Sequence, residues 1–395
     1  MGYFKYTNFL LSSLETLGIF GKGASSSALV IILPLGISFY TFKAMSYIVD
    51  AYRKQQEPVS NFTDFFLYLS FFPHLAAGPI VRAKDFLPQL KTRSRPGFED
   101  WQFAIYRIAR GFFLKLIVAD HIATSANSVF AGDYQTLSIV SSWLGAIFFA
   151  VQILCDFAGY SDIAIGLGRL LGFRTPENFD NPYFSSSLGE FWRRWHISLS
   201  TWFRDYVYFP LARSKWMSKF VYSPLTGSRF DLFRTAIPTL TMFVLSGLWH
   251  GANWTFLLWG FLHGLGVVVE RQTGMYALQQ RQDIKGASAR LAWGFATLMF
   301  IVFAWVPFRA ADVFSTFQYW NAMFFGGLQG NFLSSTQLNG LFWLTVFLIY
   351  QMFTSIKENR FKSLAPALQR AESWAYFAAI LFIANQPADF IYFRF

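Results

Sequence analysis

Two long stretches without any formally charged residue constrain the fold of this chain more than any other feature. Residues 235–269 and 313–356 contain no Asp, Glu, Lys or Arg. A bilayer core about 30 Å thick is crossed by about 20 apolar residues in helical form, so each stretch is long enough for two crossings. The sequence therefore predicts an all-α, polytopic integral membrane protein.

Further charge-poor stretches extend this prediction along the chain. They are residues 24–42, 65–81, 101–119, 134–155, 291–308 and 373–388, of which the third is interrupted by Arg107, Arg110 and Lys115. Together with the two long stretches they predict about eight to ten membrane segments. Because no internal repeat and no Pro- or Ser-rich linker divides the sequence, we expect a single membrane domain over residues 1–395.

The composition agrees with a lipid-facing surface. Aromatic residues make up 21% of the chain and charged residues 14%, against about 25% charged residues in soluble domains. The net charge of +11 is spread over connecting segments, which is typical of cytoplasmic loops or headgroup contacts and not of a nucleic-acid surface. A single cysteine, Cys155, excludes an internal disulfide and a multi-cysteine metal site.

Residues 177–211 mix tryptophans with arginines more closely than any other part of the chain. Such a segment is too polar to cross lipid comfortably and too apolar for an ordinary loop, which favours an interfacial or re-entrant helix. Ser187 and Glu190 have the spacing of a capping box at a helix start. A plain interfacial anchor with arginines that reach the headgroups explains the segment equally well.

Two histidines lie inside the apolar stretch LSGLWHGANWTFLLWGFLHG at residues 245–264. An ionisable group at membrane depth is a functional candidate, and neutral imidazole can take a proton from a hydroxyl and return it to a thiolate. The alternative for His250 is a hydrogen bond between helices. On a straight helix His263 is turned away from His250 by about 220°, so we expect a structural or supporting role for it.

Other polar residues are weaker candidates. Asp156 and Asp162 border an apolar segment and could line a cavity, although capping or helix pairing explains them better, and His74 and His121 fit turns or interfaces. No metal-binding HExxH spacing, no P-loop and no GxSxG motif is present, so we expect no metal site.

The sequence resembles the membrane-bound O-acyltransferase family (MBOAT), in the bacterial branch that contains the membrane subunit of alginate O-acetylation. The resemblance rests on EFWRRWHISLSTWFRDYVYFPL (190–211) and LSGLWHGANWTFLLWGFLHG (245–264), with YFKYTNF (3–9), LPLGISFYTF (33–42), FFPHLAAGPIVR (71–82) and FIYFRF (390–395). It implies the MBOAT fold around a central tunnel, a catalytic His250 and an assisting His196.

The resemblance also implies a reaction and its setting. Acetyl-CoA, not permanently bound, is the expected acyl donor on the cytoplasmic side of the bacterial inner membrane, and an exported polysaccharide such as alginate is the expected acceptor. A periplasmic SGNH-hydrolase-like acetyltransferase is the expected partner. D-alanyl transfer to teichoic acid and peptidoglycan O-acetylation remain open, as do a transporter or flippase and an inactive scaffold.

Two departures from the family pattern accompany the resemblance. Relatives usually carry further membrane segments before the YFKYTNF motif, which leads us to expect that this chain lacks them. After Pro210 relatives often continue into a GGNR turn, whereas this chain reads LARSKWMSKFVYSPLTGSR.

Overall fold

The computed structural model describes residues 1–19, 34–92, 95–218, 228–273, 284–327, 333–360, 365–384 and 390–391. Within these residues the chain is helical and contains no β-strand. The helical elements are η1 (Gly2–Tyr6), α1 (Thr7–Thr16), α2 (Ile37–Tyr52), α3 (Phe62–Ser70), η2 (Phe72–His74), α4 (Ala83–Thr92), α5 (Phe98–Phe112), η3 (Phe113–Ala119), α6 (Asp120–Phe130), α7 (Ile139–Leu170), η4 (Pro182–Phe184), α8 (Leu188–Arg194), α9 (Ile197–Phe203), η5 (Arg204–Tyr208), α10 (Phe209–Ala212), α11 (Lys215–Ser218), α12 (Ser228–His250), α13 (Trp254–Gln272), α15 (Ile284–Arg309), α16 (Val313–Phe325), α17 (Ser335–Arg360) and α18 (Ala365–Ile383).

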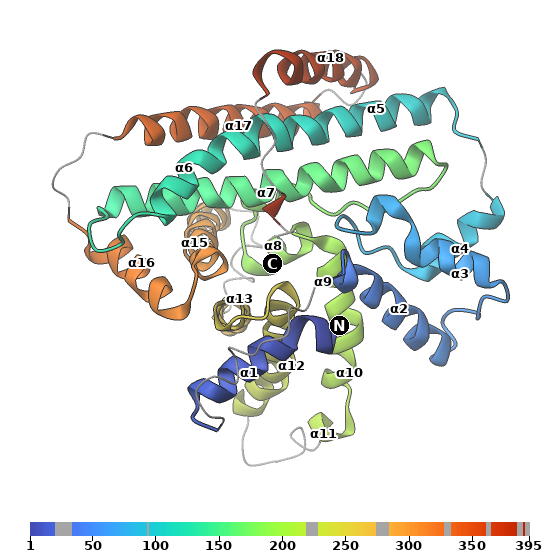
Figure 1. Cartoon of the computed structure of the whole chain (residues 1–395), viewed down its shortest axis with the longest axis horizontal. Helices are drawn as coiled ribbons and strands as arrows, with labels where there is room; N and C mark the ends of the chain where they lie inside the picture. The colour runs from blue at the N-terminus through green and yellow to red at the C-terminus, as the bar shows by residue number, and fades with distance from the viewer. Residues whose placement is uncertain are drawn as a thin grey trace.

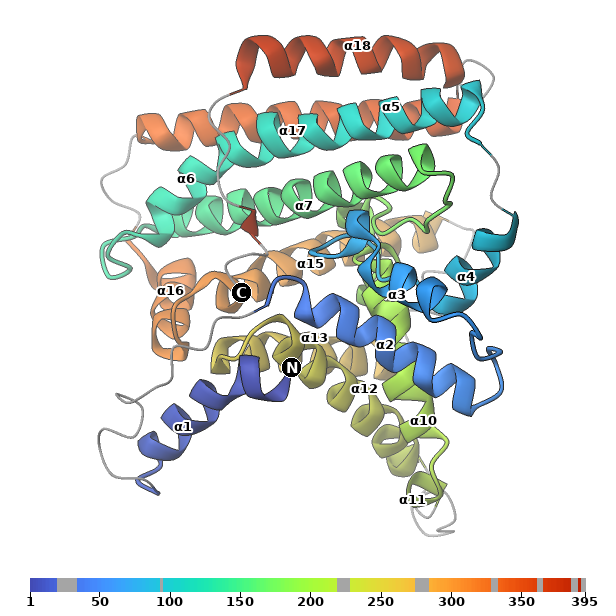
Figure 2. The same cartoon turned by 45° about the vertical axis from the view of Figure 1, so that its right-hand side comes forward.

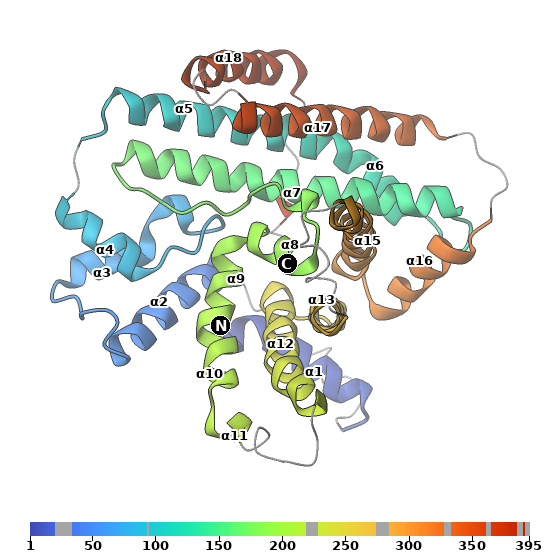
Figure 3. The same cartoon turned by 180° about the vertical axis from the view of Figure 1, so that it is seen from behind.

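The long helix α7 lies at the centre of a layered arrangement. Helices α5 and α6, joined by η3 into one bent rod, run beside α7 together with α17, and α18 packs outside α5 (Figures 1 and 2). On the opposite side of α7 lie α15, α8 and α9, followed by the pair α12 and α13 (Figure 3). The short helices α8 and α9 are therefore enclosed between the long helices and this pair.

The two long charge-free stretches each contain two helices, and the two membrane crossings predicted for each stay a prediction. Residues 235–269 form most of α12 and α13, and residues 313–356 form α16 and most of α17. Three described helices are long and apolar enough to cross a membrane, namely Ile139–Leu170, Gly286–Arg309 and Ser335–Ser355. The sequence-based number of eight to ten membrane segments stays a prediction.

One predicted membrane segment is wrong. Residues 65–81 do not form a continuous helix, because α3 ends at Ser70 and Pro73 lies in the short turn η2. Gly78 follows with a φ of 94°, a left-handed conformation that glycine adopts at little cost. Of the predicted segment 24–42, residues 24–33 lie outside the described residues, and α2 begins at Ile37.

Helices α12 and α13 approach each other so closely that their glycines cannot carry a side chain. A Cβ atom on Gly247 of α12 would lie 2.1 Å from the Phe256 carbonyl oxygen of α13. A Cβ atom on Gly260 of α13 would lie 2.2 Å from the Phe243 carbonyl oxygen of α12. Small residues that let two helix backbones touch are typical of membrane helix pairs.

We expect Gly247→Ala to push α12 away from α13 and to lower the free energy of unfolding by about 1–3 kcal/mol. Thermal melting of the purified protein in detergent measures the change. Gly294→Ala on α15 is the control, since a Cβ atom there has no neighbour closer than 3.5 Å. Equal melting of the two variants would show that the α12–α13 contact tolerates a methyl group.

Candidate active site

The aromatic and basic segment folds into short helices that begin as predicted. Ser187 is the N-cap of α8, and its hydroxyl accepts a hydrogen bond from the Glu190 N–H at 3.0 Å. Glu190 itself accepts hydrogen bonds from the backbone and hydroxyl of Ser186. Burial raises the pKa of Glu190, but these hydrogen bonds and the positive charges of Arg194 and Arg193 outweigh it and hold the pKa below its ordinary value. These hydrogen bonds thus fix the start of α8, the helix that precedes His196.

His196 lies at the kink between α8 and α9. It is the N-cap of α9 and adopts a left-handed backbone conformation, with φ 41° and ψ 54°. Its side chain is 0% exposed. A left-handed residue other than glycine costs of order 1 kcal/mol and is found disproportionately at functional sites. The strained backbone at His196 therefore marks this imidazole as a candidate functional group.

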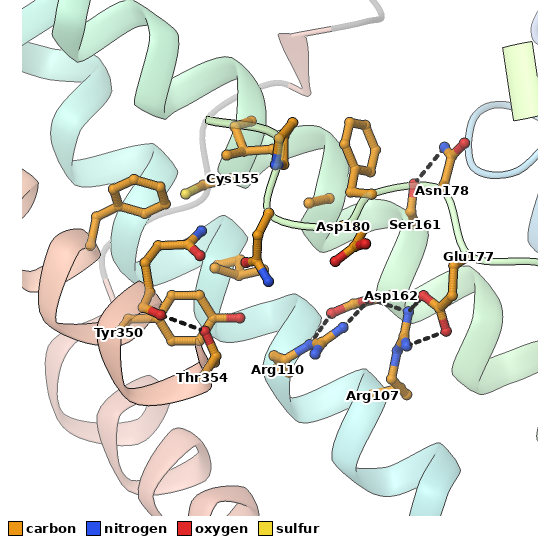
Figure 4. A pocket seen from close by; sticks show the side chains of 18 residues that line it. Arg107, Arg110, Cys155, Ser161, Asp162, Glu177, Asn178, Asp180, Tyr350 and Thr354 are labelled. Carbon is orange, nitrogen blue, oxygen red and sulfur yellow. Dashed lines mark hydrogen bonds and ion pairs between the residues drawn. The ribbon is translucent and has the colours of Figure 1, made fainter. Parts of the chain in front are cut away.

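Asn178 orients the His196 ring. Its Oδ1 accepts hydrogen bonds from the Ser198 N–H at 3.2 Å and the Ser198 hydroxyl at 2.8 Å, and lies 3.2 Å from His196 Nδ1. Its amide nitrogen donates to Ser161 Oγ at 3.1 Å, as Figure 4 shows.

These contacts define the tautomer of His196. A backbone N–H can only donate, so the Asn178 atom that faces Ser198 must be the oxygen. The His196 Nδ1 that faces the same oxygen must then carry a proton, which leaves Nε2 as the acceptor of the neutral ring. Nε2 is buried and has no hydrogen-bond partner within the described part of the chain. It is therefore placed to accept a hydrogen bond from a substrate.

Asn178 lies in the aromatic and basic segment 177–211, but the sequence does not predict a role for it. Its only local signal is a polar side chain among the aromatic residues of NFDNPYF, which does not reveal a bond to Ser161 and His196.

His250 is the last residue of α12 and is 4% exposed. Its ring is surrounded by an aromatic enclosure of Trp249, Trp259 and Phe308, with ring centroids 4.9, 5.1 and 5.2 Å away. The centroids of the His196 and His250 rings are 6.5 Å apart. The fold thus brings the two predicted site histidines together, although they lie on separate helices.

His263 lies near this pair but on α13. It is 0% exposed, and its ring contacts Trp259 at 4.9 Å and Trp192 at 5.1 Å. The assumption of one straight helix from His250 to His263 is wrong, because α12 ends at His250 and α13 starts at Trp254. Trp259 contacts both histidines, and the supporting role predicted for His263 stays a prediction.

A polar cavity of about 310 Å³ reaches Asn178 from the side of α5, α7 and α17 (Figure 4). Asp162 lines it and forms ion pairs with Arg107 and Arg110 of α5. Asp156 of α7 pairs with Lys115 at 2.8 Å. The two aspartates therefore bind helices together, and Asp162 also borders the cavity.

A larger pocket of about 620 Å³ adjoins the site between α8–α10 and the pair α12–α13. Ile197, next to His196, and Ser246, one turn before His250, both line it. Its walls are mainly apolar, and its rim carries the exposed arginines Arg193, Arg204 and Arg271. Arg204 pairs with Asp205, whereas Arg193 and Arg271 form no ion pair with a described residue. We call it the arginine pocket.

Comparisons with known proteins identify the family of this chain. The model of the membrane-bound O-acyltransferase family matches residues 38–220 and 213–311. The chain is 40% identical over 352 residues to the "Probable alginate O-acetylase" of Pseudomonas putida and of Pseudomonas aeruginosa, covering 89% of this chain and 67% and 63% of those proteins. It is 33% identical over 357 residues to a peptidoglycan O-acetyltransferase of Helicobacter pylori, covering 84% and 63%.

The chain spans about two thirds of the length of these relatives. The family match covers the helices that hold both site histidines, and the identity extends over most of the chain. The chain belongs to the membrane-bound O-acyltransferase family.

Proposed function

We propose that this chain is a membrane O-acyltransferase that moves an acetyl group from a cytoplasmic thioester toward hydroxyl groups of an exported polysaccharide. The observation that carries the proposal is the pairing of two buried imidazoles, His196 and His250, beside the arginine pocket. Buried imidazoles are costly in an apolar body, which favours a chemical role over a packing role.

The proposed reaction has two stages, attack on the thioester and release of the thiolate, and each stage includes one proton transfer. The acceptor hydroxyl oxygen attacks the thioester carbonyl carbon while His250 takes the hydroxyl proton. The C–S bond then breaks, and the protonated imidazole returns the proton to the leaving thiolate. His196 accepts a hydrogen bond at Nε2 and so orients the acceptor hydroxyl. The aromatic enclosure keeps water from hydrolysing the thioester.

The arginine pocket supports a donor that carries phosphate groups, such as acetyl-CoA. Guanidinium groups recognise phosphate through paired, charge-assisted hydrogen bonds, and the apolar walls suit the thioester arm. A rim of exposed arginines also favours the cytoplasmic side of the membrane, where basic residues accumulate. A phosphopantetheine-bearing carrier protein has the same chemistry and is the alternative donor.

The arginine pair without ion-pair partners gives a direct test of the donor. We expect the double variant Arg193→Gln, Arg271→Gln to raise the KM for acetyl-CoA about tenfold and to leave kcat within about twofold. Steady-state kinetics of the purified protein measure both constants. Arg213→Gln is the control, because Arg213 is exposed over the Phe209 ring and does not line the pocket. An unchanged KM in the double variant would remove the donor from this pocket.

The acceptor and setting follow the relatives. Since two of the reported relatives are named as alginate O-acetylases, we propose alginate or a similar exported polysaccharide, with peptidoglycan as the second candidate because of the Helicobacter pylori relative. We place the chain in the bacterial inner membrane, with a periplasmic SGNH-hydrolase-like partner that completes delivery.

Expression of the chain in cells that have lost their own polymer acetylase tests the proposal. We expect acetyl ester to return to the exported polymer, measured by proton NMR after purification. Return of acetyl to peptidoglycan alone would select the second acceptor. If the chain is present in the membrane at the level of the lost enzyme and no polymer gains acetyl, the transferase proposal is wrong, and a transporter or an inactive scaffold becomes the better reading.

A further inference from the structure

The C-terminal end of α12, which holds His250, is capped by residues near the start of the sequence. The last four carbonyls of a helix have no partner within it. In α12 the Gly247 carbonyl accepts from the Gly251 N–H at 3.2 Å, as in many helix ends. The three carbonyls that follow are all satisfied by side chains of η1.

Two residues of η1 provide these hydrogen bonds. The Tyr6 hydroxyl donates to the Leu248 carbonyl at 2.8 Å. The Lys5 ammonium donates to the Trp249 carbonyl at 2.5 Å and to the His250 carbonyl at 3.0 Å. Figure 2 shows the N-terminal end of α1, which continues from η1, beside the junction of α12 and α13, with α1 running away from α12. A complete helix end is therefore built from segments more than 240 positions apart in sequence.

The charge of Lys5 suits this position. A cation near a helix C-terminus is stabilised by the partial negative charge of the last carbonyls. Lys5 forms no ion pair with a carboxylate of a described residue, so its ammonium group is committed to α12. Just beyond the cap, the Phe9 and Trp254 rings lie 5.5 Å apart and hold α1 against the start of α13.

We propose that Lys5 and Tyr6 are positioning residues that hold the terminal turn of α12, and with it the His250 ring, in the geometry that acyl transfer requires. The catalytic consequence rests on the function proposed above, whereas the cap itself does not. A misplacement of about 1 Å in a catalytic group can cost about a hundredfold in rate, so a frayed last turn is enough to lower activity.

The test combines activity with a measurement that needs none. Parent, Lys5→Met, Lys5→Arg and Tyr6→Phe chains are expressed at matched membrane levels in cells that have lost their polymer acetylase. We expect Lys5→Met to lower polymer acetylation about tenfold, Tyr6→Phe to lower it less, and Lys5→Arg to keep most of it, because arginine retains the charge and the donors. Thr7→Ala is the matched control, since its hydroxyl bonds only to the Tyr3 carbonyl within the same segment.

Hydrogen–deuterium exchange on the purified chains examines the cap directly. In Lys5→Met we expect the amides of residues 248–251 to exchange at least about fivefold faster, with α7 unchanged. Unchanged exchange at residues 248–251 would overturn the inference, whatever the activity. Faster exchange with undiminished acetylation would overturn the positioning role alone. If the parent itself transfers no acetyl group, the proposed function fails while the exchange result still decides whether the cap exists.

Discussion

Alanine in place of His250 is expected to lower polymer acetylation by about a thousandfold, the range that a positioned general base contributes. The loss follows because the rings that enclose His250, those of Trp249, Trp259 and Phe308, cannot take up a proton. The His196 ring centroid lies farther away, at 6.5 Å. Acetyl content of the exported polymer, at matched amounts of membrane protein, measures the effect. His250→Gln should fail equally, since an amide keeps the volume but does not take up a proton.

His263→Gln is the matched control for this prediction. His263 is as deeply buried as His250 and contacts the same Trp259 ring, so both substitutions disturb similar packing. We expect His263→Gln to keep acetylation within about threefold of the parent, because its role is exerted through packing. Equal acetylation by the parent and by His250→Ala would remove His250 from the chemistry. A loss in His263→Gln as large as in His250→Ala would show that packing of the enclosure, and not proton transfer, limits the rate.

Leucine in place of Asn178 is expected to lower acetylation about a hundredfold, because a catalytic histidine in the wrong tautomer loses most of its activity. Leucine has no acceptor that would keep the proton on His196 Nδ1. The proton can then move to His196 Nε2, which would no longer accept a hydrogen bond. The backbone N–H of Ser198 also loses its partner in a buried place, which adds a stability cost of about 1–3 kcal/mol. Activity is therefore compared at equal amounts of folded protein.

Aspartate at position 178 separates the tautomer from the packing. A carboxylate oxygen still accepts from Ser198 and from His196 Nδ1, so the tautomer is kept. The negative charge of the carboxylate favours the protonated form of the His196 ring, in which Nε2 no longer accepts a hydrogen bond. As the solution is acidified, this variant should therefore lose activity at a higher pH than the parent. We expect Asn178→Asp to retain more activity than Asn178→Leu and to shift the acidic limb of the pH–rate profile upward. Equal activity of Asn178→Asp and Asn178→Leu would argue against a tautomer role.

Much of the fold could be predicted because membrane helices are encoded locally. Absence of charge over residues 235–269 and 313–356 is sufficient to place two helix pairs, and Ser187 marks the start of α8. The pattern failed at residues 65–81, where apolar composition resembles a membrane segment but Pro73 ends the helix. Apolar composition alone does not distinguish a helix that crosses lipid from a segment packed among other helices.

The site could be predicted only in part, because some of its residues act through contacts with distant parts of the sequence. His250 carries its own signal, because an imidazole is unusual in an apolar setting. His196 lies beside two arginines, and only the family resemblance indicates a role for it. Asn178 and Lys5 carry no signal of their own, since their roles consist of hydrogen bonds to groups distant in sequence: a serine hydroxyl on α7 and the carbonyls that end α12. The turn at residues 251–253 was also missed, and with it the arrangement in which one tryptophan contacts two histidines.

The left-handed backbone at His196 has a consequence for how this position evolves. Glycine adopts that conformation without strain, but in this buried place it would also remove a ring that packs 4.6 Å from the Phe157 ring and would leave a cavity. The backbone conformation therefore favours glycine at this position, whereas the packing favours a ring of the same size. Under the proposed function, a lineage that stops modifying its polymer should replace this histidine first by a residue that fills the same space, and not by glycine.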